Sequence, residues 1–172
     1  ADHPNVTAIL AAHFPGQESG HSLVDVLYGE VNPSGHLPYT IAMNGSDYNA
    51  PPTTAINTTG YDDWQSYFDE KLEIDYRYFD AHNMTVRYEF GFGLSYTTFD
   101  VADVSVNAPD GADAPVTVTG SVTNTGALAG AEVVQVYLGV PVEGQPPKRL
   151  VGFQKVFVEP GESKPVSITI DP

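Results

Sequence analysis

The sequence predicts a short α/β segment followed by an antiparallel β-sandwich, and three patterns support this fold class. Within the first forty or so residues, strand, helix and strand signals follow one another, as in an α/β unit. After residue 99, apolar and polar residues alternate with a period of two between turn residues. A loop-rich stretch separates these parts. We therefore divide the chain into residues 1–42, 43–98 and 99–172.

The first segment contains a strand, a helix and a second strand. Residues 5–12 form an apolar run without alternation, which is typical of a strand buried on both faces of a parallel sheet. Residues 17–28 have apolar residues at helical spacing, and Gly29 follows as a C-terminal cap. Residues 37–42 predict another strand. One such unit cannot cover a sheet on both faces, so we expect the segment to be the end of a larger α/β domain.

The third segment contains several short strands. Alternation is clear over residues 116–123, 134–138 and 166–170, with turns at 124–126 and 160–162. We count about five strands after residue 100, against the roughly seven of an immunoglobulin-like sandwich. We therefore expect the sandwich to lack its last strands, and the chain to be truncated at both ends.

Composition excludes several classes of function. The formal net charge is -15, from 22 acidic and 7 basic residues, so neither nucleic acid nor an anionic membrane surface is expected as a partner. Cysteine is absent, which excludes disulfides and thiolate chemistry. Four Asn-X-Ser/Thr sequons exceed the number expected by chance and favour a secreted, extracellular glycoprotein. Their acceptors are Asn5, Asn44, Asn57 and Asn83.

Five motifs, taken in order, resemble one known enzyme family. They are Pro15-Gly16-Gln17-Glu18-Ser19-Gly20, Asn32-Pro33-Ser34-Gly35-His36-Leu37-Pro38, Asp75-Tyr76-Arg77-Tyr78-Phe79-Asp80, Arg87 to Tyr96, and Gly152-Phe153-Gln154-Lys155 followed by Pro160-Gly161-Glu162-Ser163. Together they resemble the C-terminal portion of family-3 glycoside hydrolases, and in particular secreted fungal β-glucosidases. Several motifs in one register are more specific than any single one.

The resemblance implies a fold and a function. It implies the end of an α/β sandwich domain, an interdomain linker and a fibronectin type III-like domain. It also implies a retaining enzyme that releases glucose from the non-reducing ends of β-glucosides such as cellobiose, in cellulose degradation and without a cofactor. The catalytic Asp and Glu of such an enzyme are expected on an upstream part, the partner of this chain. No catalytic residue is assigned here, and the chain alone is expected to be inactive.

Two residues are weighed as substrate-proximal candidates. Glu18 lies near a helix start, where the free N–H groups and the helix dipole favour a carboxylate, or alternatively it hydrogen-bonds a loop near the sugar site. Trp64 lies among Tyr61, Tyr67 and Phe68, which either stack on sugar rings or anchor a long loop. A metal site of His13, Glu18 and His21 is rejected, because the spacing is not that of a helical metal motif.

An acidic cluster lies in the middle segment. Two of its carboxylates would suit a retaining glycosidase, but spacing alone does not select them, and a solvated acidic loop is the favoured interpretation. The cluster comprises Asp62, Asp63, Asp69, Glu70, Glu73 and Asp75.

Residues 87–99 are interpreted as the hinge that docks one domain on the other. Phe90, Phe92 and Tyr96 are accordingly expected to be mostly buried. The alternative function is a non-catalytic module that binds polysaccharide or lignin through exposed aromatic side chains, and a third is a purely structural interaction domain.

Overall fold

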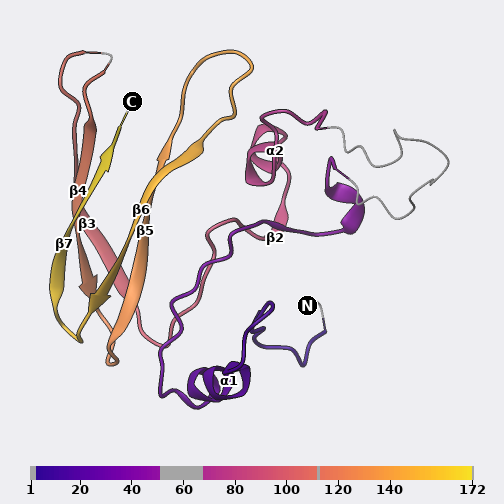
Figure 1. Ribbon diagram of the computed structural model, residues 1–172, viewed down its shortest axis with the longest axis vertical. Coiled ribbons are helices and arrows are strands. Elements are labelled where there is room, and N and C mark those ends of the chain that lie inside the picture. The colour runs from indigo at the N-terminus through magenta and orange to yellow at the C-terminus, as the bar shows by residue number, and fades with distance from the viewer. Residues whose placement is uncertain (1–2, 51–67, 112, 172) are drawn as a thin grey trace.

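The computed structural model describes residues 3–50, 68–111 and 113–171. Figure 1 shows the C-terminal strands gathered on one side, with the helices and the N-terminal segment on the other. Between these parts, a stretch of the first segment and a stretch of the linker run side by side. The linker therefore returns along the first segment before it enters the β-rich part.

Helix α1 spans Ser19–Tyr28 and confirms the predicted helix. It ends because Gly29 adopts the left-handed conformation, with φ of 83° and its N–H directed to Val26 O. Leu27 is 59% exposed, so the apolar residues that predicted the helix are not covered by described residues.

The predicted strand at residues 5–12 is wrong. The segment has no ladder hydrogen bonds, and Ile9 is 56% exposed. A doubly buried strand needs a neighbour on each side to pair its backbone groups. None of the described segments runs beside residues 5–12, and the apolar pattern alone cannot create the pairing.

The predicted strand at residues 37–42 forms only in part. Strand β1 spans Ile41–Ala42 and pairs antiparallel with β2, Val86–Tyr88, with an irregular register. Leu37 extends this contact, since its N–H donates to Phe92 O at 2.8 Å and its carbonyl accepts from Gly91 N at 2.7 Å. The strand thus pairs with the linker, because the linker is the neighbour that the described chain supplies.

The described parts of the middle segment, residues 43–50 and 68–98, contain short regular pieces between irregular stretches, as predicted. A 3₁₀ turn, η1, spans Gly45–Asp47, and helix α2 spans Tyr76–Ala81. Tyr76 and Phe79 are buried, and Phe79 packs edge-on against Tyr48 with ring centroids 5.5 Å apart. The short helix is therefore held by its aromatic residues.

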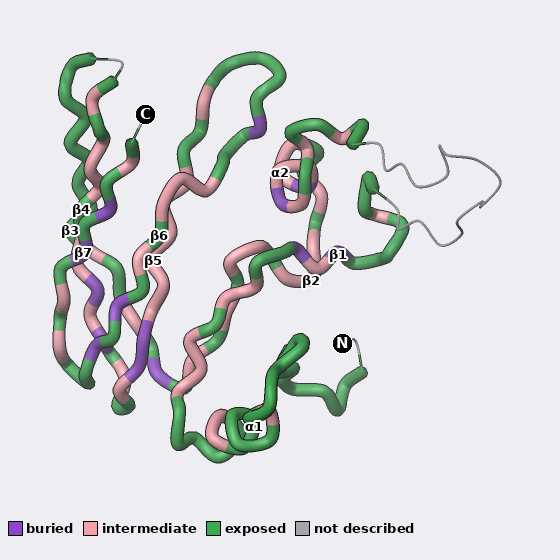
Figure 2. Tube along the Cα trace, viewed as in Figure 1, coloured by how far each residue is buried: buried purple, intermediate pink, exposed green. Residues whose placement is uncertain are grey.

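Among the described residues after 98 there are five strands, in agreement with the alternating pattern. They are β3 (Phe99–Asn107), β4 (Val116–Asn124), β5 (Gly130–Leu138), β6 (Arg149–Val158) and β7 (Ser163–Ile170). One sheet has the order β3-β4-β7 and the other pairs β5 with β6, all antiparallel. Figure 2 places most of the buried residues on these strands.

The core of the sandwich lies between the two sheets. Val122 and Val166 come from one sheet and Val156 and Val158 from the other, and Phe99 packs against them. Val122 and Val158 are fully buried, at 0% exposure. The residues whose alternation predicted β4 and β7 thus point inward, as a half-buried strand requires.

We predict that Val122→Ala lowers the free energy of unfolding by about 2 kcal/mol, because it removes two buried methyl groups and leaves a cavity. Val104→Ala is the matched control, since Val104 lies on β3 but is 65% exposed. That substitution should change stability by less than about 0.5 kcal/mol. Urea unfolding followed by circular dichroism measures both, and equal effects would contradict the described core.

Candidate functional site

The three parts of the chain meet at Asn32. Its side-chain Nδ2 donates to Ala129 O at 3.0 Å, on the approach to β5. Its Oδ1 accepts from Ser95 Oγ at 2.8 Å and from the Tyr96 backbone N–H at 2.9 Å. One amide therefore joins the first segment, the linker and the sandwich, using both its donor and its acceptor.

Two glycines permit this close approach. A Cβ on Gly93 would lie 2.5 Å from Gly35 O, and a Cβ on Gly130 would lie 2.5 Å from Asn32 Nδ2. Neither residue has a positive φ, so the requirement is for space between backbones. Gly93 of the linker and Gly130 of β5 thus permit close packing at the junction.

A second asparagine, Asn124, fixes the linker to the sandwich from within. It is 1% exposed, and its Oδ1 accepts from Thr97 Oγ1 at 2.8 Å and from Gly126 N at 3.0 Å. Its Nδ2 donates to Leu128 O at 2.8 Å and to Val158 O at 2.9 Å. All four hydrogen-bonding positions of the amide are satisfied, as a buried polar group requires.

Asp75 joins the first segment to α2. Its Oδ1 accepts from Thr40 N at 2.8 Å, and its Oδ2 accepts from Thr40 Oγ1 at 2.9 Å and from Tyr76 N at 2.6 Å. Asp75 precedes the helix as its N-cap and holds a φ of 53°, which is unfavourable for a residue with a Cβ. Three hydrogen bonds to the carboxylate offset this backbone strain.

Helix α2 also docks on the sandwich. Tyr76 Oη accepts from the Leu150 backbone N–H at 2.7 Å, and its ring lies 4.6 Å from Phe90 and 6.0 Å from Tyr137, centroid to centroid. Nearby, Gln135 Nε2 donates to Gly91 O at 3.1 Å. Aromatic packing and two side-chain hydrogen bonds thus close this side of the junction.

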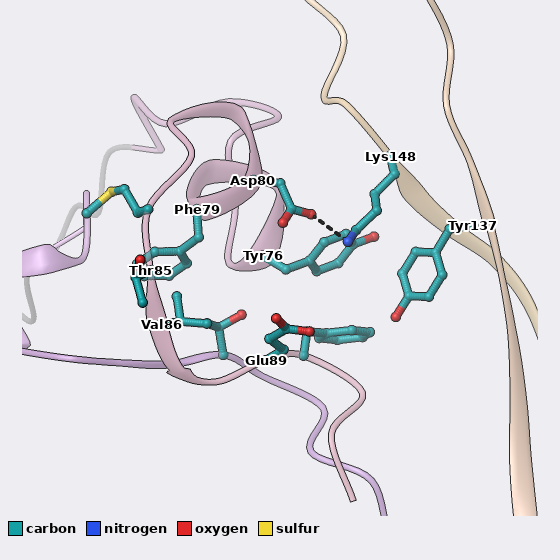
Figure 3. A pocket seen from close by; sticks show the side chains of 11 residues that line it. Tyr76, Phe79, Asp80, Thr85, Val86, Glu89, Tyr137 and Lys148 are labelled. Carbon is teal, nitrogen blue, oxygen red and sulfur yellow. Dashed lines mark ion pairs between the residues drawn. The ribbon is translucent and has the colours of Figure 1, made fainter.

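A cavity of about 250 Å³ lies between α2, β2 and β5. Tyr76, Phe79 and Tyr137 line it together with Asp80, Glu89 and Lys148 (Figure 3). Lys148 Nζ lies 3.2 Å from Asp80 Oδ2 and 5.4 Å from the centroid of the Tyr137 ring. Carboxylates, an ammonium group and aromatic faces therefore converge on one space formed by the linker and the sandwich.

Tyr137 has a perturbed acidity in this setting. Burial raises the pKa of its phenol, and the neighbouring Tyr76, Asp80 and Glu89 raise it further because a second negative charge is disfavoured there. The phenol donates a hydrogen bond to Gln135 Oε1 at 2.6 Å, so its single donor is occupied, while its oxygen can still accept a hydrogen bond.

Glu18 lies at the start of α1, as predicted; it takes the N-cap position, but its side chain makes no capping hydrogen bond. Its carboxylate instead contacts His21 Nδ1 at 2.7 Å on an exposed surface. His13 lies apart from both and contacts Tyr39 Oη at 2.9 Å. No group of three His, Cys, Asp or Glu side chains suited to a metal occurs among the described residues.

Several predicted candidates fall outside the described residues. Trp64, Tyr61 and Tyr67 are among them, as are Asp62 and Asp63 of the acidic cluster and the sequon residue Asn57. Of the aromatic group, the structure describes Phe68, which is 72% exposed.

The described part of the acidic cluster does not gather at one site. Asp69 is exposed, whereas Glu73 contacts His82 Nε2 at 2.9 Å and Asp75 caps α2. The sequence interpretation of a solvated acidic loop missed the structural role of Asp75. Its position directly before an aromatic helix is the N-cap signal that could have revealed this role.

The expected burial of the linker aromatics is corrected. Phe90 is half-buried, but Phe92 is 39% exposed and Tyr96 is 48% exposed. Tyr96 nonetheless contributes to the junction, because its hydroxyl donates to Val26 O at 2.7 Å. The hinge is held by hydrogen bonds to backbone atoms more than by ring burial.

Three sequon residues, Asn5, Asn44 and Asn83, are exposed. Asn44 differs from the others because its Nδ2 lies 3.3 Å from Asp47 Oδ2, as part of the cap of η1. In the described ranges, no helix is long and apolar enough to cross a membrane.

Two family models match the chain. Residues 1–96 match the glycosyl hydrolase family 3 C-terminal domain, and residues 132–172 match a fibronectin type III-like domain.

Curated relatives and solved structures agree with these matches. The chain is 63% identical over 96% of its length to a probable β-glucosidase G of Emericella nidulans, and 58% identical over 99% to one of Aspergillus flavus. Among solved structures, it resembles the β-glucosidase D2-BGL from Chaetomella raphigera, with a TM-score of 0.78 at 41% identity over 91% of the chain. The β-D-glucoside glucohydrolase from Trichoderma reesei gives a TM-score of 0.76 at 42% identity over 90% of the chain. The chain spans 23–24% of these four proteins.

We predict that Asn32→Ala destabilises the chain by about 2–3 kcal/mol, because it removes three hydrogen bonds and leaves Ala129 O without its donor. Asn107→Ala, at the exposed end of β3, should have little effect. Urea unfolding measures both changes. Similar values for the two variants would show that Asn32 does not hold the junction.

Asp75 allows a sharper comparison. Asp75→Ala loses the three hydrogen bonds and still requires a Cβ at a φ of 53°, whereas Asp75→Gly loses the same bonds without that penalty. We expect the glycine variant to be more stable than the alanine variant by about 1 kcal/mol, with both below the parent. Thermal unfolding gives the order, and an alanine variant as stable as the parent would refute the capping role.

Proposed function

Since the chain belongs to glycosyl hydrolase family 3, we propose that it is the C-terminal part of a retaining β-glucosidase. The reaction would release glucose from the non-reducing ends of β-glucosides such as cellobiose. The observation that carries this proposal is the 63% identity, over 96% of the chain, to a protein named a probable β-glucosidase. The identity to solved β-glucosidases, at 41–42%, supports the same activity.

We propose that the catalytic carboxylates lie on an upstream part of the same protein. A retaining glycosidase needs a nucleophile and an acid/base whose oxygens are free to act on the substrate. Asp75, a half-buried carboxylate of the described cluster, has both oxygens engaged by hydrogen-bond donors. Glu18 is exposed beside His21. These arrangements favour structural roles for both residues.

The role proposed for this chain is to brace the enzyme at the junction between its domains. Asn32, Asp75 and Asn124 join the first segment, the linker and the sandwich through hydrogen bonds of fixed direction. We retain the division at residues 42 and 98 as part of the proposal. The start of β3 at Phe99 supports the second boundary.

Secretion and N-glycosylation belong to the same proposal. Exposure of Asn5, Asn44 and Asn83 is compatible with glycan attachment. Intact-mass measurement before and after enzymatic removal of N-glycans tests it. An unchanged mass for protein secreted by a glycosylating host would refute it.

A binding module is the second candidate function. Phe153 and Phe157 on β6 are 67% and 54% exposed, and exposed aromatic side chains can bind polysaccharide or lignin. A pull-down on insoluble cellulose separates this candidate from a bracing role. The binding module would be favoured if the parent chain is retained on the cellulose and the Phe153→Ala variant is not.

We predict that the chain alone does not hydrolyse an aryl β-glucoside, whereas the protein at its natural length does. Chromogenic release of the aryl group measures both. Turnover by the chain alone, at a rate comparable to that of the longer protein, would place the catalytic carboxylates here and refute the proposal.

In the longer protein, Asn32→Ala should shorten the half-life at elevated temperature several-fold while changing kcat/KM at 25 °C by less than about twofold. A shorter half-life with nearly unchanged kcat/KM distinguishes a bracing role of Asn32 from a role in the catalysed reaction. A large fall in kcat with unchanged thermal stability would assign Asn32 to the reaction instead.

A further inference from the structure

We propose that the cavity between α2, β2 and β5 binds a single neutral sugar ring. The proposal rests on the size, lining and charge of this cavity and does not depend on the glucosidase activity. The walls come from the linker and the sandwich together, so a bound sugar would contact both (Figure 3).

The size selects a small ligand. A volume of about 250 Å³ lies just below the ~300–1,000 Å³ of pockets that hold drug-sized molecules. It is also several times the volume of one water molecule, which is roughly 30 Å³ in the liquid. A single six-membered sugar ring falls between these limits, whereas a disaccharide would extend out of the cavity.

The lining offers both of the surfaces that a pyranose needs. Tyr76, Phe90 and Tyr137 supply apolar aromatic surface for the C–H side of a ring, and they are held against one another at centroid distances of 4.6 and 6.0 Å. The ring of Tyr76 is further fixed by its hydrogen bond with Leu150 N. These walls are therefore formed before any ligand binds.

The polar groups require a ligand that donates as well as accepts. Asp80 Oδ2 is buried, and although it lies 3.2 Å from Lys148 Nζ it receives no hydrogen bond of good geometry. The Tyr137 hydroxyl donates its hydrogen bond to Gln135 Oε1, so its oxygen is left to accept, and the carboxylate of Glu89 can only accept. Lys148 can only donate. Sugar hydroxyls satisfy both kinds of partner at once.

The charge of the cavity argues against ionic ligands. Asp80 and Glu89 outnumber Lys148, so a phosphate or carboxylate would meet an excess of negative charge. An organic cation would have to displace Lys148, whose Nζ already lies 3.2 Å from Asp80 Oδ2 and 5.4 Å from the centroid of the Tyr137 ring. A neutral polyhydroxylated ring avoids both conflicts.

Ligand-observed NMR on the protein at its natural length tests the proposal, with D-glucose as the probe. We expect a binding event in the millimolar range that weakens about tenfold in Lys148→Met and in Glu89→Gln, because each loses a charge-assisted hydrogen bond. Lys155→Met is the matched control, since Lys155 lies on β6 away from the cavity. It should leave binding unchanged.

Lys148 and Glu89 are solvent-accessible, so both variants should fold, and an unchanged unfolding midpoint checks this. Unchanged glucose affinity in both variants would overturn the proposal, and so would the absence of any event sensitive to Lys148. Hydrolysis of an aryl β-glucoside is measured separately. The cavity and the glucosidase activity can therefore fail independently.

Discussion

The hydrogen bonds of Asn32 are the constraint on which the rest of the arrangement depends. Its amide holds Ala129, Ser95 and Tyr96 at one point, where the first segment, the linker and the sandwich meet. A neutral amide is suited to this task because it donates and accepts without the desolvation cost of a charge. Hydrophobic contact could press the same parts together, but it would not fix their register.

Register matters because the linker is fastened at adjacent residues to different partners. Tyr96 N bonds to Asn32 Oδ1, and Thr97 Oγ1 bonds to Asn124 Oδ1. A slip that put Tyr96 in the place of Thr97 would remove the threonine hydroxyl from Asn124 Oδ1, which would keep only its hydrogen bond from Gly126 N. The loss of one such hydrogen bond costs about 1 kcal/mol, so the two asparagines together favour the observed alignment. The exposure of Phe92 and Tyr96 is compatible with this account, because the alignment does not depend on burying them.

The sequence predicted the elements whose causes are local. Gly29 ends α1 through its own conformation, and the alternation of β4 and β7 arises from the core that they share. Residues 5–12 failed as a strand because strand formation needs a neighbour that the run itself does not contain. The antiparallel pairing of β1 with β2 was missed for the same reason, since it joins residues more than forty positions apart.

The candidate site was less predictable, because its contacts span long distances in the sequence. The bond between Asn32 and Ala129 joins residues 97 positions apart, and no spacing rule connects them. Asp75 is the exception, since a carboxylate directly before a helix is a local signal, although its strained φ of 53° follows from the contacts of the folded chain. The same long-range docking that hides these roles also creates the cavity. Tyr76 brings α2 against Leu150, and this contact places Asp80 opposite Lys148 with a space between the linker and the sandwich. The polar lining of that space is therefore a consequence of how the two parts are joined, and this lining determines which ligand the cavity would bind.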